Sequence, residues 1–409
     1  MRDIGSVIPV SDCLLCRSKG VVQLLDLGPQ PICNRFLASP SEDEFLHGMV
    51  MGFCKDCGLV QLIDPVPAKE LMPRVDWISY NEPEAHLDDL AQKIRELPGI
   101  TADSTICGVS FKDDSLLGRM EGMGIGQTWR IDPAKDLGIT EAGVGVETVQ
   151  ERLTPETARK LAQERGLADV VIVRHILEHA HDSSRFVQAV KTLVKPTGYI
   201  VFEVPDCTKS LDTNDYSCPW EEHVLYFTPE TLKRGLALRE MPLVSYTSYP
   251  YSLENSLVAI VRPHSDSQSV GPIEPILAVE QERVSNYAGA LDGSRMRFQG
   301  YLSDYRRSQG KVALLGAGHL ACTFINLLEL KDYFEFIVDD NPDKRGHYLP
   351  GSGLPIIGSD SLVSENIKLC LLSVHPTAED RVVENNRSFT ENGGAFASMF
   401  PSSKLALKA

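Results

Sequence analysis

Apolar runs alternate with segments of helical periodicity through the middle of the chain. The strand-like runs cover residues 105–109, 128–132, 169–173, 199–204 and 256–261, and helical patterns cover 84–97, 154–165, 183–193 and 229–238. Strands that alternate with helices predict a mostly parallel sheet with helices on both faces. We therefore expect an α/β domain over residues 76–265.

The two ends of the chain have different patterns. Residues 1–75 are rich in turns and proline, which predicts a module that a bound metal stabilises. A linker rich in Ser, Pro and Asp over 262–275 precedes a polar connecting helix. Strand-like runs at 311–315 and 334–339 flank a glycine-rich turn and a helix, so a second α/β domain is expected over 275–409.

Composition narrows the classes of partner. The 409 residues are 43% hydrophobic, and 40 basic against 56 acidic residues give a net charge of -16. This charge disfavours nucleic acid and anionic membranes as partners. The start has no signal-peptide pattern and about 18 consecutive apolar residues occur nowhere, so we expect a soluble cytoplasmic enzyme with a small-molecule substrate.

Four of the ten cysteines form two Cys-x-x-Cys pairs, Cys13 with Cys16 and Cys54 with Cys57. Two such knuckles can close a tetrahedral sulfur cage around Zn²⁺, and four protein ligands leave no open position, so a structural zinc is predicted. The alternative, a redox-active pair, expects one motif at the start of a helix beside a βαβ unit. The scattered remaining cysteines suit a reducing compartment.

Several short motifs occur together in a characteristic order. They are the four cysteines, Ser79-Tyr80-Asn81-Glu82 with His86, Ile131-Asp132-Pro133-Ala134, His175-Ile176-Leu177-Glu178-His179, Phe202-Glu203-Val204-Pro205, and Glu221 to Phe227. With this order, nearly the whole chain resembles the sugar C-methyltransferases that modify nucleotide-linked keto sugars. The resemblance implies a zinc-binding module, a central class I methyltransferase domain of Rossmann-like fold that binds S-adenosylmethionine, and a C-terminal Rossmann-like domain.

The methyl donor needs a turn that approaches it closely and an acid that accepts hydrogen bonds from its ribose. Asp132 is placed for the ribose, although it could simply cap a helix. The resemblance adds Ser110, Asp113 and His175 as donor contacts. The family has a Gly-x-Asn-Asp-Gly turn where this chain has Ser110 to Asp114. Since a side chain at such a glycine would cause backbone strain, either the turn takes another course and still binds the donor weakly, or the fold serves a different chemistry. Lys112 would also bring a positive charge towards a sulfonium.

The resemblance also implies a catalytic set. His223 matches the general base, and a histidine suits this role because its ordinary pKa is about 6.5. Glu222 would orient it or stabilise its charge. Tyr80, His179 and Tyr226 would steady the developing oxyanion or line the pocket. The alternative is a polar loop in which His223 has no chemical role.

The C-terminal domain carries Gly316-x-Gly318 after a strand and Asp339 at the end of the next one, the parts of a dinucleotide fingerprint. We expect this turn, with His319, to bind the nucleotide end of the substrate; the alternative is a turn needed only for close packing. Asn255 stands in Glu254-Asn255-Ser256, where the family has Gly-Gly-Ser near the sugar.

Three functions follow in order of preference. The first is C-methylation of a nucleotide-linked or otherwise activated keto sugar with S-adenosylmethionine, with His223 as base. The second is a methyltransferase-fold enzyme that only abstracts a proton, for isomerisation or elimination, or that binds NAD in its C-terminal domain. The third is a non-catalytic scaffold that keeps the zinc module.

Overall fold

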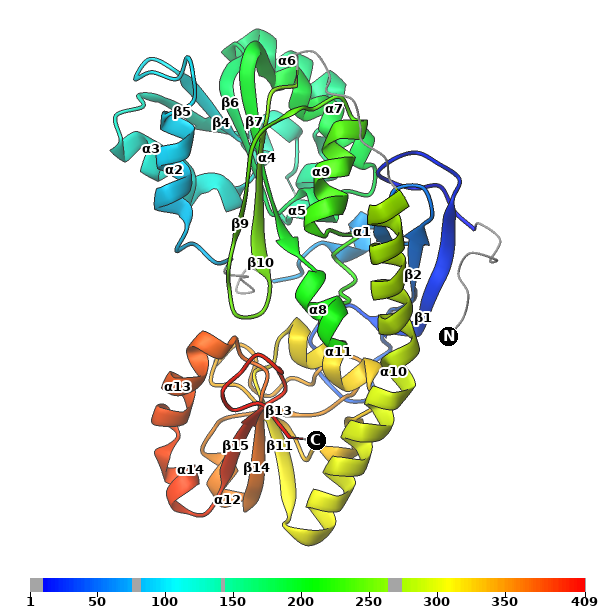
Figure 1. The fold of residues 1–409 in the computed structure, drawn as a ribbon. Helices are drawn as coiled ribbons and strands as arrows, with labels where there is room; N and C mark the ends of the chain where they lie inside the picture. Colours follow the sequence, from blue (N-terminus) through cyan, green and yellow to red (C-terminus); the bar gives the residue numbers. More distant parts are fainter. Residues whose placement is uncertain (1–9, 76–81, 141–143, 264–273, 409) are drawn as a thin grey trace.

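The computed structural model describes residues 10–75, 82–140, 144–263 and 274–408. Three sheets organise them into a small N-terminal module, a central α/β domain and a C-terminal α/β domain, with one long helix running beside all three (Figure 1). None of the helices among these residues has the length and apolarity needed to span a bilayer.

The first sheet has the order β1-β2-β3-β8 and combines two parts of the chain. The N-terminal module provides β1 (Val21–Pro31), β2 (Leu46–Cys54), β3 (Val60–Leu62) and the short helix α1 (Ala68–Leu71). The fourth strand, β8 (Leu225–Tyr226), comes from the central domain and pairs antiparallel with β3. The segment that contains His223 therefore continues directly into the sheet of the N-terminal module.

The central sheet has the order β5-β4-β6-β7-β10-β9. Its strands are β4 (Thr105–Gly108), β5 (Gln127–Arg130), β6 (Ala168–Arg174), β7 (Val194–Asp206), β9 (Leu243–Tyr249) and β10 (Asn255–Val261). The first four are parallel, and β10 runs antiparallel to both of its neighbours. Chain order reverses between β4 and β6, and ligands of open α/β sheets bind outside such a point.

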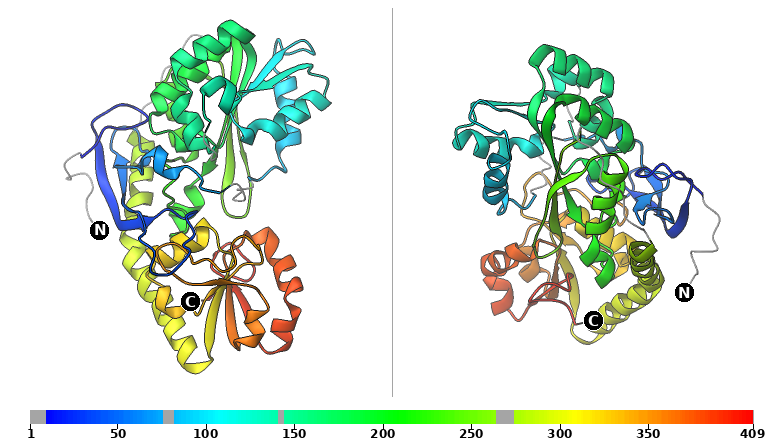
Figure 2. Two further views of the ribbon diagram at one scale, coloured as in Figure 1. Left: turned by 180° about the vertical axis from the view of Figure 1, so that it is seen from behind. Right: turned by 45° about the horizontal axis from the view of Figure 1, so that its top comes forward.

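Helices cover both faces of this sheet, as the alternating pattern predicts (Figure 2). Val170 and Ile172 pack with α2 (Leu87–Arg95) and α3 (Asp114–Gly122), while Val171 and Val173 face the opposite core. The remaining helices are α4 (Pro133–Leu137), α5 (Val146–Arg152), α6 (Pro155–Arg165), α7 (Ser183–Leu193), α8 (Thr208–Thr213) and α9 (Pro229–Leu238), with 3-10 turns η2 (Phe111–Asp113) and η3 (Leu177–His179).

The C-terminal domain begins with the connecting helix α10 (Glu274–Ser308). Its parallel sheet has the order β13-β12-β11-β14-β15. The strands are β11 (Lys311–Leu315), β12 (Ile337–Val338), β13 (Ile356–Ile357), β14 (Ile367–Leu372) and β15 (Ala395–Ser398); the helices are α11 (His319–Leu327), η4 (Lys331–Tyr333), α12 (Ser361–Ser364), α13 (Pro376–Asn385) and α14 (Arg387–Glu391). One core joins Phe53 of the N-terminal module to Tyr287 and Leu314.

Two expected strands are too long. The strand expected over 128–132 ends at Arg130, and the strand expected over 334–339 is reduced to Ile337–Val338. In the first case the Asp132 carboxylate turns the chain by capping α4. Most of the predicted linker, residues 264–273, lies outside the described residues.

Candidate active site

The four motif cysteines come together as predicted. The Sγ atoms of Cys13 and Cys57 lie 3.6 Å apart, as do those of Cys16 and Cys54, and all four lie within 4.8 Å of one another. A tetrahedron with Zn–S bonds of about 2.3 Å has edges of about 3.8 Å. Backbone N–H groups of Leu15 and Cys16 point at the Cys13 sulfur. This geometry fits a structural Zn²⁺.

The turn after β4 is held by one buried carboxylate. Asp113 Oδ2 accepts the N–H groups of Val109 and Ser110 at 2.7 and 2.8 Å, and its Oδ1 accepts the N–H of Arg174 on β6 at 2.9 Å. Burial raises the pKa of Asp113 to about 7. The carboxylate therefore joins the ends of the two strands at which the chain order reverses.

The backbone of this turn has no strained residue where the family has glycine. Ser110 is extended, with φ of -137°, and no residue from 109 to 114 has a positive φ. Non-glycine residues adopt such backbone angles freely, so the turn does not need the family's glycines. The turn therefore takes another course than the family's, because the Asp113 carboxylate, and not a left-handed backbone, closes it.

Buried charged side chains lie beneath this turn. Glu203 on β7 accepts from Arg174 at 2.5 Å and from Ser256 at 2.6 Å, and it lies 3.0 Å from His86 and 3.1 Å from His175. Its partners keep the pKa of Glu203 well below the ordinary value against the effect of burial. These contacts fix the ends of β6, β7 and β10 relative to one another.

Lys112 is directed towards a carboxylate. Its Nζ lies 2.5 Å from Glu82 Oε1, and Glu82 is also 3.6 Å from His175 Nδ1. Although burial opposes ionisation, His175 and Lys112 lower the pKa of Glu82 to about 2. The positive charge of Lys112 is thus compensated before it can act on a cationic ligand.

His223 lies in the chain between α8 and β8, and its ring belongs to a cluster of aromatic rings. Its ring is 4.7 Å from that of His179 and 4.8 Å from that of Trp220, and a nitrogen of each histidine lies within 4.8 Å of a Glu178 oxygen. Burial, followed by His179, holds the pKa of His223 well below its ordinary value. A neutral imidazole can accept a proton.

Contrary to expectation, Glu222 is not directed at His223. Its Oε1 accepts from Asn34 Nδ2 at 2.8 Å, while Glu221 accepts from the N–H and thiol of Cys33. Burial raises the pKa of Glu222 well above its ordinary value, and Glu147 adds to the shift, so the neutral form of Glu222 is favoured. The carboxylate beside His223 is Glu178.

The other expected catalytic residues, His179, Tyr226 and Tyr80, have different outcomes. His179 is buried against Glu147, with Nδ1 2.8 Å from Oε1, and Glu147 was not expected from the sequence. The Tyr226 hydroxyl donates to the Trp220 carbonyl and accepts its N–H, so both of its hydrogen bonds are taken and we drop Tyr226 as an oxyanion donor. Tyr80 lies outside the described residues.

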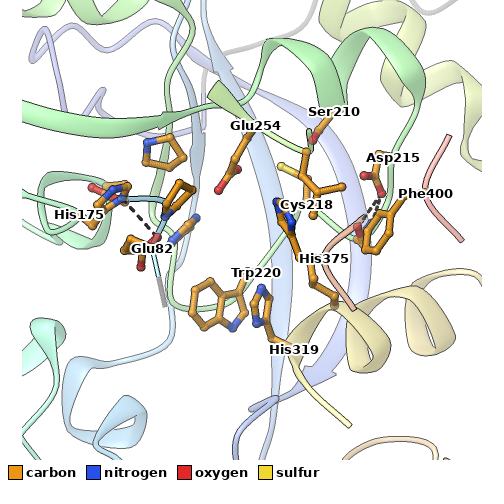
Figure 3. Close-up of a pocket in the computed structure, with 17 residues that line it drawn as sticks. Glu82, His175, Ser210, Asp215, Cys218, Trp220, Glu254, His319, His375 and Phe400 are labelled. Atoms are coloured by element: carbon orange, nitrogen blue, oxygen red, sulfur yellow. Dashed lines mark hydrogen bonds and ion pairs between the residues drawn. The ribbon is translucent and has the colours of Figure 1, made fainter. Parts of the chain in front are cut away.

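A central cavity of about 270 Å³ opens between the two α/β domains (Figure 3). Residues from both α/β domains line it, among them Glu82, His175, Glu178, Trp220, His223 and Glu254. The sequence motifs contain the three glutamates, yet motif matching assigned them no role. The clearest signal that could have identified them is an acidic residue within each matched motif.

A C-terminal cavity of about 300 Å³ lies at the glycine turn. Gly316, Gly318, Asp339 and Lys344 line it together with Asn34 of the N-terminal module. Gly316 has φ of 111°, and a Cβ there would lie 2.7 Å from Ser373 Oγ, so glycine is required. A Cβ at Gly318 would meet nothing within 4 Å, which leaves room for a ligand.

The dinucleotide role of Asp339 is not supported. Its Oδ2 accepts the Ala317 N–H at 2.9 Å and Lys344 Nζ at 3.0 Å, and its Oδ1 accepts the Asn341 N–H. Both oxygens are occupied within the domain, so a ribose would have to displace them. Asn255 is also occupied, since it donates to Asp206 and accepts from the Tyr251 N–H.

Three family models match successive parts of the chain. They describe a zinc binding domain over residues 13–71, a methyltransferase domain over 105–240 and a C-methyltransferase C-terminal domain over 274–401. The chain therefore combines these three domains, and it is a methyltransferase. One relative of matching length is the C-methyltransferase NovU of Streptomyces niveus, 24% identical over 99% of this chain and 98% of NovU.

Shorter likenesses are confined to part of the chain. The ubiquinone biosynthesis O-methyltransferase of Ralstonia nicotianae is 31% identical over 33% of this chain and 51% of its own. Among solved structures, 1,6-didemethyltoxoflavin-N1-methyltransferase of Burkholderia thailandensis is 14% identical, with a TM-score of 0.30 over 44% of this chain and 78% of its own. A SAM-dependent methyltransferase of Anabaena variabilis is 11% identical, with a TM-score of 0.29 over 44% and 85%.

The crevice between β4 and β6 fits S-adenosylmethionine, the donor of this class. Asp132 Oδ1 accepts the N–H groups of Ala134 and Lys135, as the capping alternative predicted, which leaves Oδ2 for a ribose hydroxyl. The turn needs no glycine, and the charge of Lys112 is compensated by Glu82. None of these residues has to change its partners for the donor to bind.

Proposed function

We propose that this enzyme transfers a methyl group from S-adenosylmethionine to a carbon of a nucleotide-linked keto sugar. The central and C-terminal cavities carry this proposal, because both are lined by His319 and Leu320. A substrate that extends through both would have one end beside His223 and the other beside Lys344 and the Gly316 turn. A sugar joined to a nucleotide diphosphate has this shape and this distribution of charge.

The C-terminal cavity suits the anionic end of such a substrate. Lys344 Nζ is held by the Ala317 carbonyl at 2.7 Å and by Asp339 at 3.0 Å, so its ammonium group has a fixed place on the cavity wall. Open space at Gly318 allows the backbone N–H groups that begin α11 to approach a phosphate. Charge-assisted hydrogen bonds to phosphate are among the strongest in proteins.

The central cavity supplies the base. An unprotonated ring nitrogen of His223 takes a proton from the carbon next to the ketone, and the C–H electron pair becomes that of an enolate. The imidazolium that forms lies beside Glu178, whose carboxylate can stabilise its charge. S-adenosylmethionine, when bound, supplies the methyl group that the enolate carbon accepts. The proton leaves His223 to solvent after release of the product.

The donor would lie in the crevice between β4 and β6. Asp132 is positioned for the ribose, and Ser110, Asp113 and His175 surround the turn at the strand ends. Ser110 and Asp113 are buried and hold that turn, so we assign them a positioning role. His175 faces Glu82, Glu178 and Glu203, whose charges raise its pKa well above the ordinary value despite burial.

Mass spectrometry tests the proposal directly. The enzyme is incubated with the donor and a panel of nucleotide-linked keto sugars, and a mass gain of one methylene unit on the sugar is expected. Because burial lowers the pKa of His223, the acidic limb of the kcat/KM profile should lie below pH 6.5. Methyl transfer to oxygen, or solvent deuterium exchange without any methylation in the presence of the donor, would overturn C-methylation.

A further inference from the structure

One acidic group of the central cavity differs from the others in its contacts. Glu254 lies in the turn before β10, and its carboxyl group points into the cavity (Figure 3). Within the described residues, no hydrogen bond or ion pair reaches this carboxyl group. Burial raises the pKa of Glu254 to about 8, and Glu82 adds to the shift. Such a group is stabilised by any cation that enters the cavity.

The other acidic groups of the cavity already face cations or donors. Glu82 pairs with Lys112, and Asp215 accepts from the N–H and hydroxyl of Ser217. Glu178 lies 3.4 Å from His175 Nδ1. Among the described residues, Glu254 is therefore the one of these four acids whose carboxyl group has neither a hydrogen bond nor an ion pair.

His175 is the cavity histidine whose raised pKa favours the charged form, and it already faces Glu82, Glu178 and Glu203. Burial and the charge of His179 keep His223 neutral by lowering its pKa, and burial lowers the pKa of His319 to about 4. Glu178 is a further sign that the cavity binds a ligand. Its side chain is 1% exposed, and neither of its two carboxylate oxygens has a hydrogen-bond partner. Buried polar atoms without partners are rare, and each requires an explanation.

We propose that the central cavity takes a sugar that carries an ammonium group and that Glu254 selects this substrate over its hydroxyl analogue. The inference rests on the proposed function, because it assumes that the sugar lies in this cavity. An ammonium group would favour the ionised form of Glu254 and could donate to both Glu254 and Glu178. A hydroxyl group would leave Glu254 in its neutral form, and neutral hydrogen bonds are about half as strong as charged ones.

Paired substrates and matched variants test this selection. Nucleotide-linked keto sugars that differ only in an amine or a hydroxyl on one ring carbon are compared by calorimetry and by kcat/KM. We expect the wild-type enzyme to favour the amine by about tenfold or more, and Glu254→Gln to remove that preference. Glu254→Gly, which removes the side chain, should act in the same way. Glu282→Gln changes the same charge at an exposed site on α10 and should leave the preference intact.

The outcomes separate this inference from the proposed function. Equal use of both sugars by the wild-type enzyme would contradict the selection by Glu254 but not the proposed C-methylation. If neither sugar binds or reacts, the proposed function itself is contradicted. If Glu254→Gln weakens binding of S-adenosylhomocysteine and leaves the sugar preference unchanged, then Glu254 faces the donor and the inference is wrong.

Discussion

The central and C-terminal sheets each have a crevice where chain order reverses, between β4 and β6 and between β11 and β14, and the two crevices are built by different means. In the first, the Asp113 side chain takes the N–H groups of the turn, and the backbone needs no positive φ. In the second, the backbone itself makes the turn, since Gly316 has φ of 111° and contacts Ser373.

The difference indicates which crevice suits proton transfer and which suits anion binding. A turn closed by side chains fills its surroundings with ionisable groups such as Asp113, Lys112 and His175, whose charges can be tuned for proton transfer. A turn closed by glycine leaves space and backbone N–H groups for an anion. We therefore expect changes in the central cavity to affect kcat and changes in the C-terminal cavity to affect KM.

Removal of zinc should have the largest effect, because it disturbs both cavities together. Asn34 of the N-terminal module lines the C-terminal cavity and also holds Glu222 next to His223. Binding of structural zinc contributes on the order of 10 kcal/mol or more to folding of small zinc domains. A chelator that strips the metal should abolish turnover and loosen both cavities, measured by activity and by hydrogen exchange of β1–β3. Full activity of protein shown to be zinc-free by metal analysis would contradict this.

Loss of the base should have the next largest effect, and only on kcat. His223→Gln keeps a polar side chain of similar size but cannot accept the proton, so kcat should fall by roughly 10² to 10⁴. Binding of S-adenosylhomocysteine and of the sugar nucleotide should stay within a factor of about three, since glutamine keeps a polar side chain of similar size on the wall of the central cavity. Glu222→Gln is the matched control, because Glu222 is directed at Asn34. An equal loss of kcat in both variants would mean that a disturbed loop, and not the loss of the base, lowers kcat.

Lys344 should affect binding alone. Lys344→Met removes the ammonium group at the C-terminal cavity, and we expect KM for the sugar nucleotide to rise about tenfold or more with kcat nearly unchanged. Arg345→Met is the control, because Arg345 pairs with Asp340 on an exposed part of the same turn. Steady-state kinetics distinguishes the two effects. A fall in kcat for Lys344→Met would break the division between the cavities.

The glycine turn should show the smallest effect, on stability. Gly316→Ala places a Cβ near Ser373 at a φ that alanine rarely adopts, so the free energy of unfolding should fall by about 1–3 kcal/mol. Gly318→Ala, at φ of -131° with open space around it, should leave stability unchanged or raise it slightly. Urea unfolding of both variants tests the pair, and equal stability losses would show that the turn has no special backbone requirement.

Local patterns were enough to predict the zinc site and the order of the domains' elements. The two Cys-x-x-Cys pairs, the strands at β4 and β6, and the glycine turn are each specified by neighbouring residues. Asp113 was expected at the donor site, but its bond to Arg174 joins residues 61 positions apart. A sequence pattern does not contain that contact, so it could not predict a turn without glycine.

The same limit explains the errors in the catalytic set. Glu222 stands next to His223 in sequence, but Asn34, which lies 188 residues earlier, determines its direction. Glu178 reaches His223 only because the Val224 N–H donates to the Glu178 carbonyl and brings two distant loops together. Such long-range contacts decide which of several acidic residues faces the base.

The pairing of β8 with β3 has a consequence for engineering. Since Leu225 and Tyr226 complete the sheet of the N-terminal module, a cut at the boundary near residue 76 would leave that sheet without its fourth strand. Chimeras that exchange this module between relatives should therefore exchange residues 220–226 with it, so that donor and recipient edges match.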